Sequence, residues 1–160
     1  AADAQSDPDL HFLLMMIPHH EQAVAMAALA ETNGASPDVL ALAKTIAGEQ
    51  QPEIAQMTAW LAEAGVPVEA DGMDMGMDMG MDMGMDGMLS DEQMAALTAA
   101  TGTEFDELFL TGMIQHHEGA IAMAKQVKAA GKDPKVAKLA DAIIAAQQAE
   151  IAQMGQMLSG

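Results

Sequence analysis

The chain has 160 residues and a formal net charge of −18, because only six basic residues accompany 24 acidic ones. This charge excludes nucleic-acid binding through a basic patch and disfavours anionic membrane surfaces. The absence of Cys excludes disulfides, thiolate zinc sites and iron–sulfur clusters, and an aromatic content of 2% leaves no platform for stacking bases or sugars. The length suits one domain with a sizeable core, but the 17 Met and five His need another explanation.

The first seven residues are small or polar, as they are in a mature protein after removal of a signal peptide. No apolar run reaches the roughly 18 residues that a membrane-spanning helix needs. We therefore expect an exported protein, periplasmic or extracellular, without membrane insertion.

An internal repeat sets the expected architecture. Residues 12–61 align without a gap with residues 109–158, at a constant offset of 97 and with 25 identities in 50 positions. Both halves contain Met-Ile-x-His-His-Glu and, further on, Gln-Gln-x-Glu-Ile-Ala-Gln-Met. Each half has the apolar periodicity of two helices and shows no strand pattern, so the chain is expected to fold as an all-α, four-helix bundle.

Helix boundaries follow from caps and breakers. An N-cap residue followed by Pro predicts three of the helix starts, and Asn33-Gly34 and Gly131 predict ends. Those three starts are Asp7-Pro8, Ser36-Pro37 and Asp133-Pro134. Thr103 with Asp106 resembles a capping box at the start of the third long helix. Pro18 and Pro52 fall inside helical patterns, so their helices are expected to continue with local kinks.

The parts of this single domain, 1–160, are expected in a simple order. Repeat one covers 8–64, a flexible Met/Asp/Gly-rich loop covers 71–88, a short helix covers 90–101, and repeat two covers 104–158. The loop is low in complexity and has no periodicity that would bury it. Ser90 to Gln93 has the residues of a capping box for the short helix.

Polar side chains occupy positions where a core is expected. On the helical wheel His19 and His116 fall in the middle of apolar faces, and His20 and His117 fall at the edges. Folding each hairpin brings these His and the neighbouring Met level with polar residues of the second helix, namely Gln50, Glu53, Gln147 and Glu150. We therefore expect a layer of His, Met, Gln and Glu at mid-height, in which every buried charge needs a partner.

Two kinds of partner remain open for this layer. In the structural alternative, Glu53 accepts a hydrogen bond from His19 or His20, and the second repeat does the same. In the other, two symmetric His pairs with nearby Met bind a metal, for which thioether sulfur favours Cu(I). A di-iron centre is disfavoured because the order is His-His-Glu rather than Glu-x-x-His, with Glu21 and Glu118 directed outward.

The loop between the repeats carries eight Met in 16 residues. They are Met73, Met75, Met77, Met79, Met81, Met83, Met85 and Met88. Thioethers need no deprotonation, so two or three of them can hold Cu(I) or Ag(I), while the interleaved Asp add negative charge. A promiscuous Met-rich interaction surface is the alternative.

Two long motifs carry a family resemblance. Residues 109–124 read Phe-Leu-x-x-Met-Ile-x-His-His-x-x-Ala-Ile-x-Met-Ala, and residues 134–154 read Pro-x-Val-x-x-Leu-Ala-x-x-Ile-x-x-x-Gln-x-x-Glu-Ile-x-x-Met. Both resemble the bacterial CopM-like copper-binding family, a domain formerly of unknown function with a ferritin-like four-helix fold. The first repeat departs at Val24 and Pro18, and the Met-Asp-Met-Gly loop lies outside the shared pattern.

The resemblance implies an exported copper-binding protein that serves copper tolerance or homeostasis through His and Met ligands. Carried over to this chain, the ligands are Met16, His19, His20, Met26, Met57, Met113, His116, His117, Met123 and Met154. Gln50, Glu53, Gln147 and Glu150 would support them.

We expect the protein to sequester or carry Cu(I), with Ag(I) and Cu(II) as further candidates, and to be no enzyme, since the sequence offers no nucleophile–base pair or phosphate loop. A copper exporter or a periplasmic copper carrier is the expected partner. The alternatives are a ferritin-like metal oxidase that uses the His/Glu layer, and a structural bundle that binds no metal.

Overall fold

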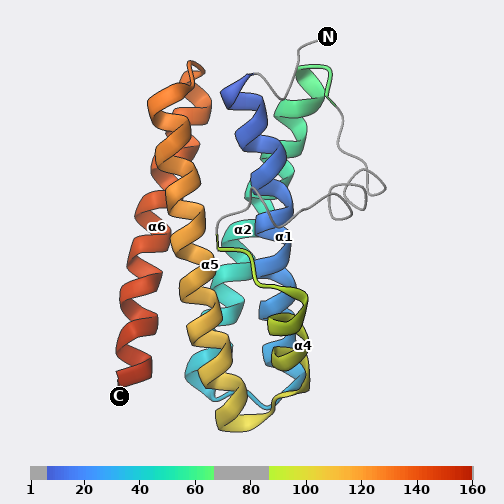
Figure 1. Ribbon diagram of the computed structural model, residues 1–160, viewed down its shortest axis with the longest axis vertical. Coiled ribbons are helices and arrows are strands. Elements are labelled where there is room, and N and C mark those ends of the chain that lie inside the picture. Colours follow the sequence, from blue (N-terminus) through green and yellow to red (C-terminus); the bar gives the residue numbers. More distant parts are fainter. Residues whose placement is uncertain (1–6, 67–86, 160) are drawn as a thin grey trace.

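The computed structural model describes residues 7–66 and 87–159, and within these ranges every regular element is a helix. In chain order the helices are α1 Pro8–Thr32, α2 Pro37–Glu63, α4 Asp91–Ala99, α5 Gly102–Ala130 and α6 Pro134–Ser159 (Figure 1). Four of them are long and form the predicted bundle, and α4 is the predicted short helix. The all-α, four-helix architecture is thereby confirmed.

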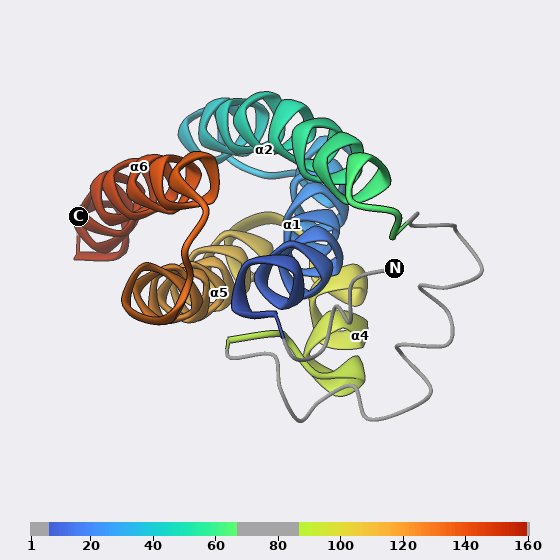
Figure 2. The ribbon, with the colours of Figure 1, turned by 90° about the horizontal axis from the view of Figure 1, so that it is seen from above.

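The four long helices form two antiparallel hairpins. Helix α1 packs along α2, α5 packs along α6, and the hairpins join through α1 and α5, with α4 against the outside of that seam (Figures 1 and 2). Helices α1 and α5 run in opposite directions. The approximate two-fold axis that relates the repeats therefore lies across the bundle at mid-height. Among the described helices, none combines the length and apolarity needed to cross a bilayer.

Most helix ends follow the local rules that predicted them. Asp7 accepts hydrogen bonds from the backbone N–H groups at the start of α1, and Ser36 does the same for α2. Ser90 and Gln93 form a complete capping box for α4. Helices α1 and α2 both continue through their internal proline, as expected.

The predicted capping box at Thr103 and Asp106 is wrong. Helix α5 begins two residues earlier than this box predicts, at Gly102, and its N-cap residue Thr101 makes no side-chain capping hydrogen bond. The carboxylate of Asp106 instead accepts a hydrogen bond from the backbone N–H of Ser36, 3.1 Å away. Asp106 therefore makes a tertiary contact with the turn between α1 and α2 instead of a local capping hydrogen bond at the start of α5.

Buried polar side chains fix the turns at both ends of the bundle. The amide of Asn33 donates to the carbonyls of Leu97, Thr98 and Ala100 at 2.9–3.2 Å, and so satisfies the C-terminal end of α4. At the other end, the carboxylate of Asp9 accepts hydrogen bonds from the backbone N–H groups of residues 132 and 133. These contacts hold the helices at the relative heights that align the central layer.

The predicted loop joins the described structure at residue 87. Residues 71–86 of that loop lie outside the described residues. Gly87 has φ +80°, and a Cβ there would lie 2.5 Å from the carbonyl oxygen of Gln115 and 2.8 Å from the Cα of Gly119. The side chain of Gln22 binds both backbone groups of Leu89, at 2.8 and 3.1 Å. The chain is therefore fixed on the α1–α5 seam at mid-height.

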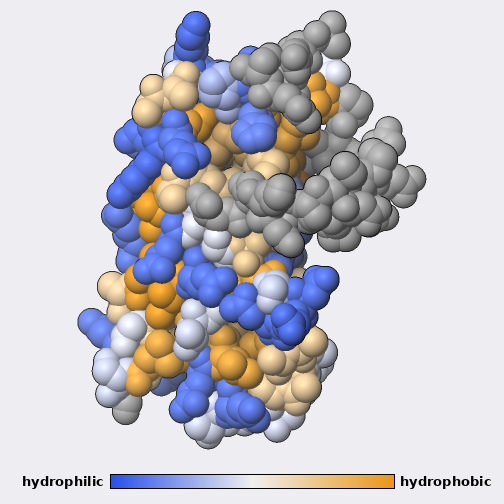
Figure 3. Space-filling model, viewed as in Figure 1, coloured by the Kyte–Doolittle hydropathy of each residue, from blue (hydrophilic) through white to orange (hydrophobic). Residues whose placement is uncertain are grey.

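The apolar core is divided into two clusters, one toward each end. One cluster contains Phe105, Phe109 and the thioethers of Met26, Met113 and Met154. The other contains the thioethers of Met16, Met57 and Met123, with leucines and isoleucines of α1, α2 and α6. The polar layer lies between them, so apolar packing on both sides positions its side chains. The surface is mixed, with apolar residues among hydrophilic ones (Figure 3).

Because Asn33 satisfies three otherwise unpaired carbonyls, Asn33→Ala should lower the free energy of unfolding by about 1–3 kcal/mol. Urea denaturation followed by circular dichroism measures the change. Glu31→Ala, at an exposed neighbouring position of α1, is the matched control and should stay within about 0.5 kcal/mol. Equal stability of the two variants would contradict this role of Asn33.

Candidate metal-binding site

A layer of four buried imidazoles crosses the middle of the bundle. His19, His20, His116 and His117 are each at most 1% exposed. Gln50 and Gln147 are 2% and 3% exposed, and Glu150 is 6% exposed. The layer of His, Gln and Glu is therefore present as predicted. His20 and His117, which the helical wheel places at the edges of the apolar faces, are covered completely by the adjacent helices α2 and α6.

Each covered imidazole is paired with a carboxylate of the adjacent helix. Nε2 of His20 lies 2.6 Å from Oε1 of Glu53, and Nε2 of His117 lies 2.6 Å from Oε1 of Glu150. Because a carboxylate accepts hydrogen bonds, each pair assigns the hydrogen to Nε2 of the imidazole and leaves Nδ1 as its second ring nitrogen. Within the described part of the chain, neither Nδ1 has a hydrogen-bond partner. The structural alternative thus accounts for one nitrogen of each ring and not for the other.

The other two imidazoles meet across the two-fold axis. The rings of His19 and His116 lie with their centroids 3.8 Å apart and their planes tilted by 41°. Both ring nitrogens of His116 are buried and find no standard hydrogen bond among the described residues. A buried polar atom without a partner lowers the stability of the folded state by about 1–3 kcal/mol. The layer is therefore destabilising unless a further ligand binds there.

The layer keeps the two imidazoles of α5 neutral. Burial lowers the pKa of His117 to about 4, with a further contribution from the nearby His20. Burial, followed by the proximity of His19, holds the pKa of His116 well below its ordinary range. A neutral imidazole is the form that binds a metal ion, so these rings need to release no proton before coordination.

Sequence analysis missed Glu49, a third carboxylate at the seam between α2 and α6. A hydrogen bond with Glu150 is the largest cause that raises the pKa of Glu49 to about 7, followed by burial and by the charge of Glu150. Burial also raises the pKa of Glu150. The spacing of four residues between Glu49 and Glu53 was a signal for this cluster. Comparison of the two repeats does not reveal Glu49, because the second repeat has Ala146 at the corresponding position.

Four predicted thioethers flank the layer. In the antiparallel register that pairs His20 with Glu53, Met16 lies level with Met57, one turn away along both helices. The second repeat places Met113 and Met154 in the same relation to the His117–Glu150 pair. All four side chains are 0% exposed. The structure therefore brings two thioethers toward each carboxylate–imidazole pair.

The remaining predicted ligands lie farther away. Met26 and Met123 are seven residues from His19 and His116, which is about 10 Å along a helix. Met88 is partly buried on the outer face, where the side-chain amide of Gln115 reaches its carbonyl. The other loop Met, Met73 to Met85, lie outside the described residues.

In the described part of the chain, no group of three or more His, Asp or Glu side chains is arranged to hold a metal ion. Imidazoles and carboxylates of the described layer therefore do not by themselves form a complete metal-binding site. What it can offer a metal is one imidazole nitrogen of each pair together with the adjacent thioethers, a donor set suited to a soft cation.

Comparison with known proteins places this geometry in context. Residues 9–158 match the family described as "Domain of unknown function (DUF305)". A protein of Acanthamoeba polyphaga mimivirus, "Uncharacterized protein L153", is 45% identical over 53 residues, which cover 33% of this chain and 35% of the viral protein. The chain therefore spans about a third of that relative.

Solved structures resemble the chain over nearly its whole length. A candidate secreted DUF305 protein of Streptomyces coelicolor is 30% identical with a TM-score of 0.83, covering 96% of this chain and 93% of the other. CopM in its Cu(I)-bound form is 32% identical with a TM-score of 0.74, covering 94% and 95%. CopM in its Cu(II)-bound form is 36% identical with a TM-score of 0.77, covering 93% and 94%.

The raised pKa of Glu49 predicts a pH-dependent stability of the metal-free protein. Between pH about 4.5 and 7, the folded chain retains a proton that the unfolded chain has released, so this stabilising contribution is lost as the pH rises through about 7. Glu49→Gln keeps a neutral hydrogen-bond donor at every pH. Its stability relative to the native sequence should therefore increase between about pH 4 and about pH 8 in urea denaturation.

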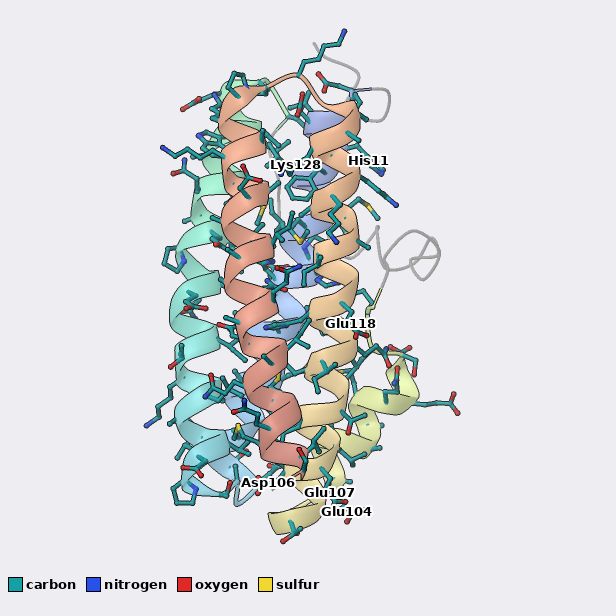
Figure 4. All side chains as sticks on the ribbon, turned by 90° about the vertical axis from the view of Figure 1, so that its left-hand side faces the viewer. His11, Glu104, Asp106, Glu107, Glu118 and Lys128 are labelled. Carbon is teal, nitrogen blue, oxygen red and sulfur yellow. The ribbon has the colours of Figure 1, made fainter. Side chains whose placement is uncertain are left out.

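The matched control for this measurement is Glu118→Gln, at an exposed position of α5 (Figure 4). Its stability difference from the native sequence should be the same at both pH values. The hydrogen-bonded pair of Glu49 and Glu150 would be contradicted by a Glu49→Gln difference that does not change with pH.

Proposed function

The chain belongs to the DUF305 family, and on that premise we propose that it binds monovalent copper inside its helical bundle, as a binding protein and not as an enzyme. Its structural neighbours include CopM with Cu(I), Cu(II) and Ag bound, which supports metal binding by this chain. The proposal adds the oxidation state, the ligands and the role.

One observation carries the proposal: two buried imidazoles each donate Nε2–H to a carboxylate and keep Nδ1 without a partner among the described residues. Metal-binding His residues commonly hold their second nitrogen in this way, because the carboxylate fixes the ring orientation and raises the basicity of the ligand. The arrangement occurs twice, at positions related by the repeat.

The adjacent side chains favour Cu(I) over harder ions. Met16 and Met57 accompany His20, and Met113 and Met154 accompany His117, all fully buried. Thioether sulfur is a soft ligand that selects Cu(I) and its analogue Ag(I). His19 and His116 lie between the two sets, where they can complete either one. We therefore assign the binding layer to these eight residues.

The wider role follows from the surface and the loop. A net charge of −18 attracts cations toward the protein. We propose that the Met-rich loop captures Cu(I) and that the His/Met layer stores it or transfers it to a copper exporter or a periplasmic carrier. In this account the protein is exported and serves copper homeostasis.

Replacing both paired imidazoles tests the core site. His20→Gln/His117→Gln keeps a donor for each carboxylate and removes the metal-binding nitrogen, so Cu(I) affinity should fall by at least about tenfold. Anaerobic competition with a colorimetric Cu(I) chelator measures the affinity. X-ray absorption at the copper edge should show fewer imidazole ligands per bound copper, and the Met-rich loop cannot supply them because residues 71–88 contain no His.

Met94→Leu, a partly buried position on α4, is the matched control and should bind Cu(I) like the native sequence. Unchanged affinity and unchanged imidazole scattering in the double His variant would contradict the core site. Oxygen consumption with Fe(II) or Cu(I) would instead support the metal oxidase. Failure of the native protein to bind either metal would leave the structural bundle.

The loop is tested by replacing its seven Met at positions 73–85 with Ser. The number of Cu(I) equivalents bound should fall, while the tight binding by the core remains. A variant with Asn at positions 74, 78, 82 and 86 keeps the thioethers and should retain most of the capacity. Loss of capacity in the Asn variant alone would show that charge, rather than sulfur, captures the ion.

A further inference from the structure

Sequence analysis left His11 and Met15 without a role, and the structure places both in one groove. A cavity of about 180 Å³ opens between the first turns of α1 and the last turns of α5. Its lining includes His11, Met15 and Met123, with Phe12 and Val127 among the apolar walls. His11 is exposed at the edge of the bundle beside α5 (Figure 4), whereas Met123 is only 7% exposed.

We propose that this groove is a second, peripheral site for a soft monovalent cation, Cu(I) or Ag(I), held by the imidazole of His11 and the thioethers of Met15 and Met123. It goes beyond the proposed function, which concerns only the central layer and the loop. His11 is eight residues from His19, about 12 Å along α1, so the two sites are separate.

The geometry of α1 and α5 supports convergence of these three side chains. His11 and Met15 are four residues apart on α1, so they lie one turn apart on the same face. Met123 enters the same groove from α5. Met side chains are flexible and can adjust to a metal, and one imidazole with two thioethers is a donor set for Cu(I).

The lining disfavours hard cations. The residues that border this groove in the described structure include no carboxylate and only one other polar side chain, Gln126. Calcium and magnesium need several oxygen ligands, which the groove does not provide. Its apolar walls would also limit the access of water to a bound soft ion.

The repeat supplies an internal comparison. The two-fold axis relates His11, Met15 and Met123 to Leu108, Gly112 and Met26. There Leu89 fills the space: a Cβ on Gly112 would lie 3.1 Å from the Leu89 side chain and 3.5 Å from the Met26 methyl group. At this end of the bundle the equivalent groove is closed by the packing of Leu89 against Gly112 and Met26. At the opposite end the groove stays open, and the imidazole of His11 and the thioether of Met15 take the places of Leu108 and Gly112.

The groove also lies near the anchored end of the Met-rich loop. Gly87 packs against Gly119, and Gly119 is one helical turn from Met123 on α5. An ion released at this end of the loop would therefore meet the groove on the same face of the bundle.

Titration of the full chain with Ag(I) tests the proposal, because Ag(I) neither oxidises in air nor disproportionates as Cu(I) does. Methyl signals of ¹³C-labelled Met and ring signals of His report each site separately. The Met15, Met123 and His11 signals should move together as Ag(I) is added. In His11→Gln, the Ag(I) concentration that half-shifts Met15 and Met123 should rise by about tenfold or more.

Met94→Leu is again the matched control and should leave the three signals unchanged in their response. In His20→Gln/His117→Gln, the groove signals should still respond, so failure of the central site and failure of the groove can be told apart. The proposal is overturned if Met15 and Met123 do not respond to Ag(I), or if they respond equally in His11→Gln.

Discussion

Burial of four imidazoles in one layer, two of them paired with carboxylates, is the constraint on which this structure depends. An unpaired charge in such a place costs several kcal/mol, and an unpaired polar atom costs about 1–3 kcal/mol. The chain limits this cost by keeping His116 and His117 neutral and by pairing His20 and His117 with glutamates at 2.6 Å. Two apolar clusters, one on each side, supply the packing that holds the layer in place.

The same layer explains why the ends of the bundle are fixed so firmly. A shift of one helix by a single turn, 5.4 Å, would separate the imidazole and the carboxylate of the pair to which that helix contributes, and would leave a buried ring without its partner. Asn33 and Asp9 satisfy backbone groups of turns distant in the sequence, and so restrict the relative heights of the helices. The hydrogen bonds in the turns at the ends and the imidazole–carboxylate bonds at the centre therefore fix the same alignment of the four helices.

The sequence was sufficient for the architecture and for the content of the layer, because a repeat with helical periodicity determines which faces are buried and which positions become level. It could not decide which His pairs with Glu53. A helical wheel describes one helix, whereas the burial of His20 depends on the helix that covers it. Glu49 was missed because the repeat has Ala146 at that place, and Asp106 was misassigned because a distant N–H of Ser36 competes for its carboxylate.

The charge of the layer bears on the ion it would hold. A neutral imidazole paired with an ionised glutamate carries one negative charge in a buried place, and a monovalent cation on Nδ1 would neutralise it. A divalent cation would leave an excess positive charge next to thioethers, which cannot offset it. The second pair differs, since the side chain of Glu150 is 8% exposed against 24% for that of Glu53, and Glu150 also interacts with Glu49. The halves of the layer are thus alike in ligands and unequal in the surroundings of their carboxylates, so two ions bound there would be held with different affinities.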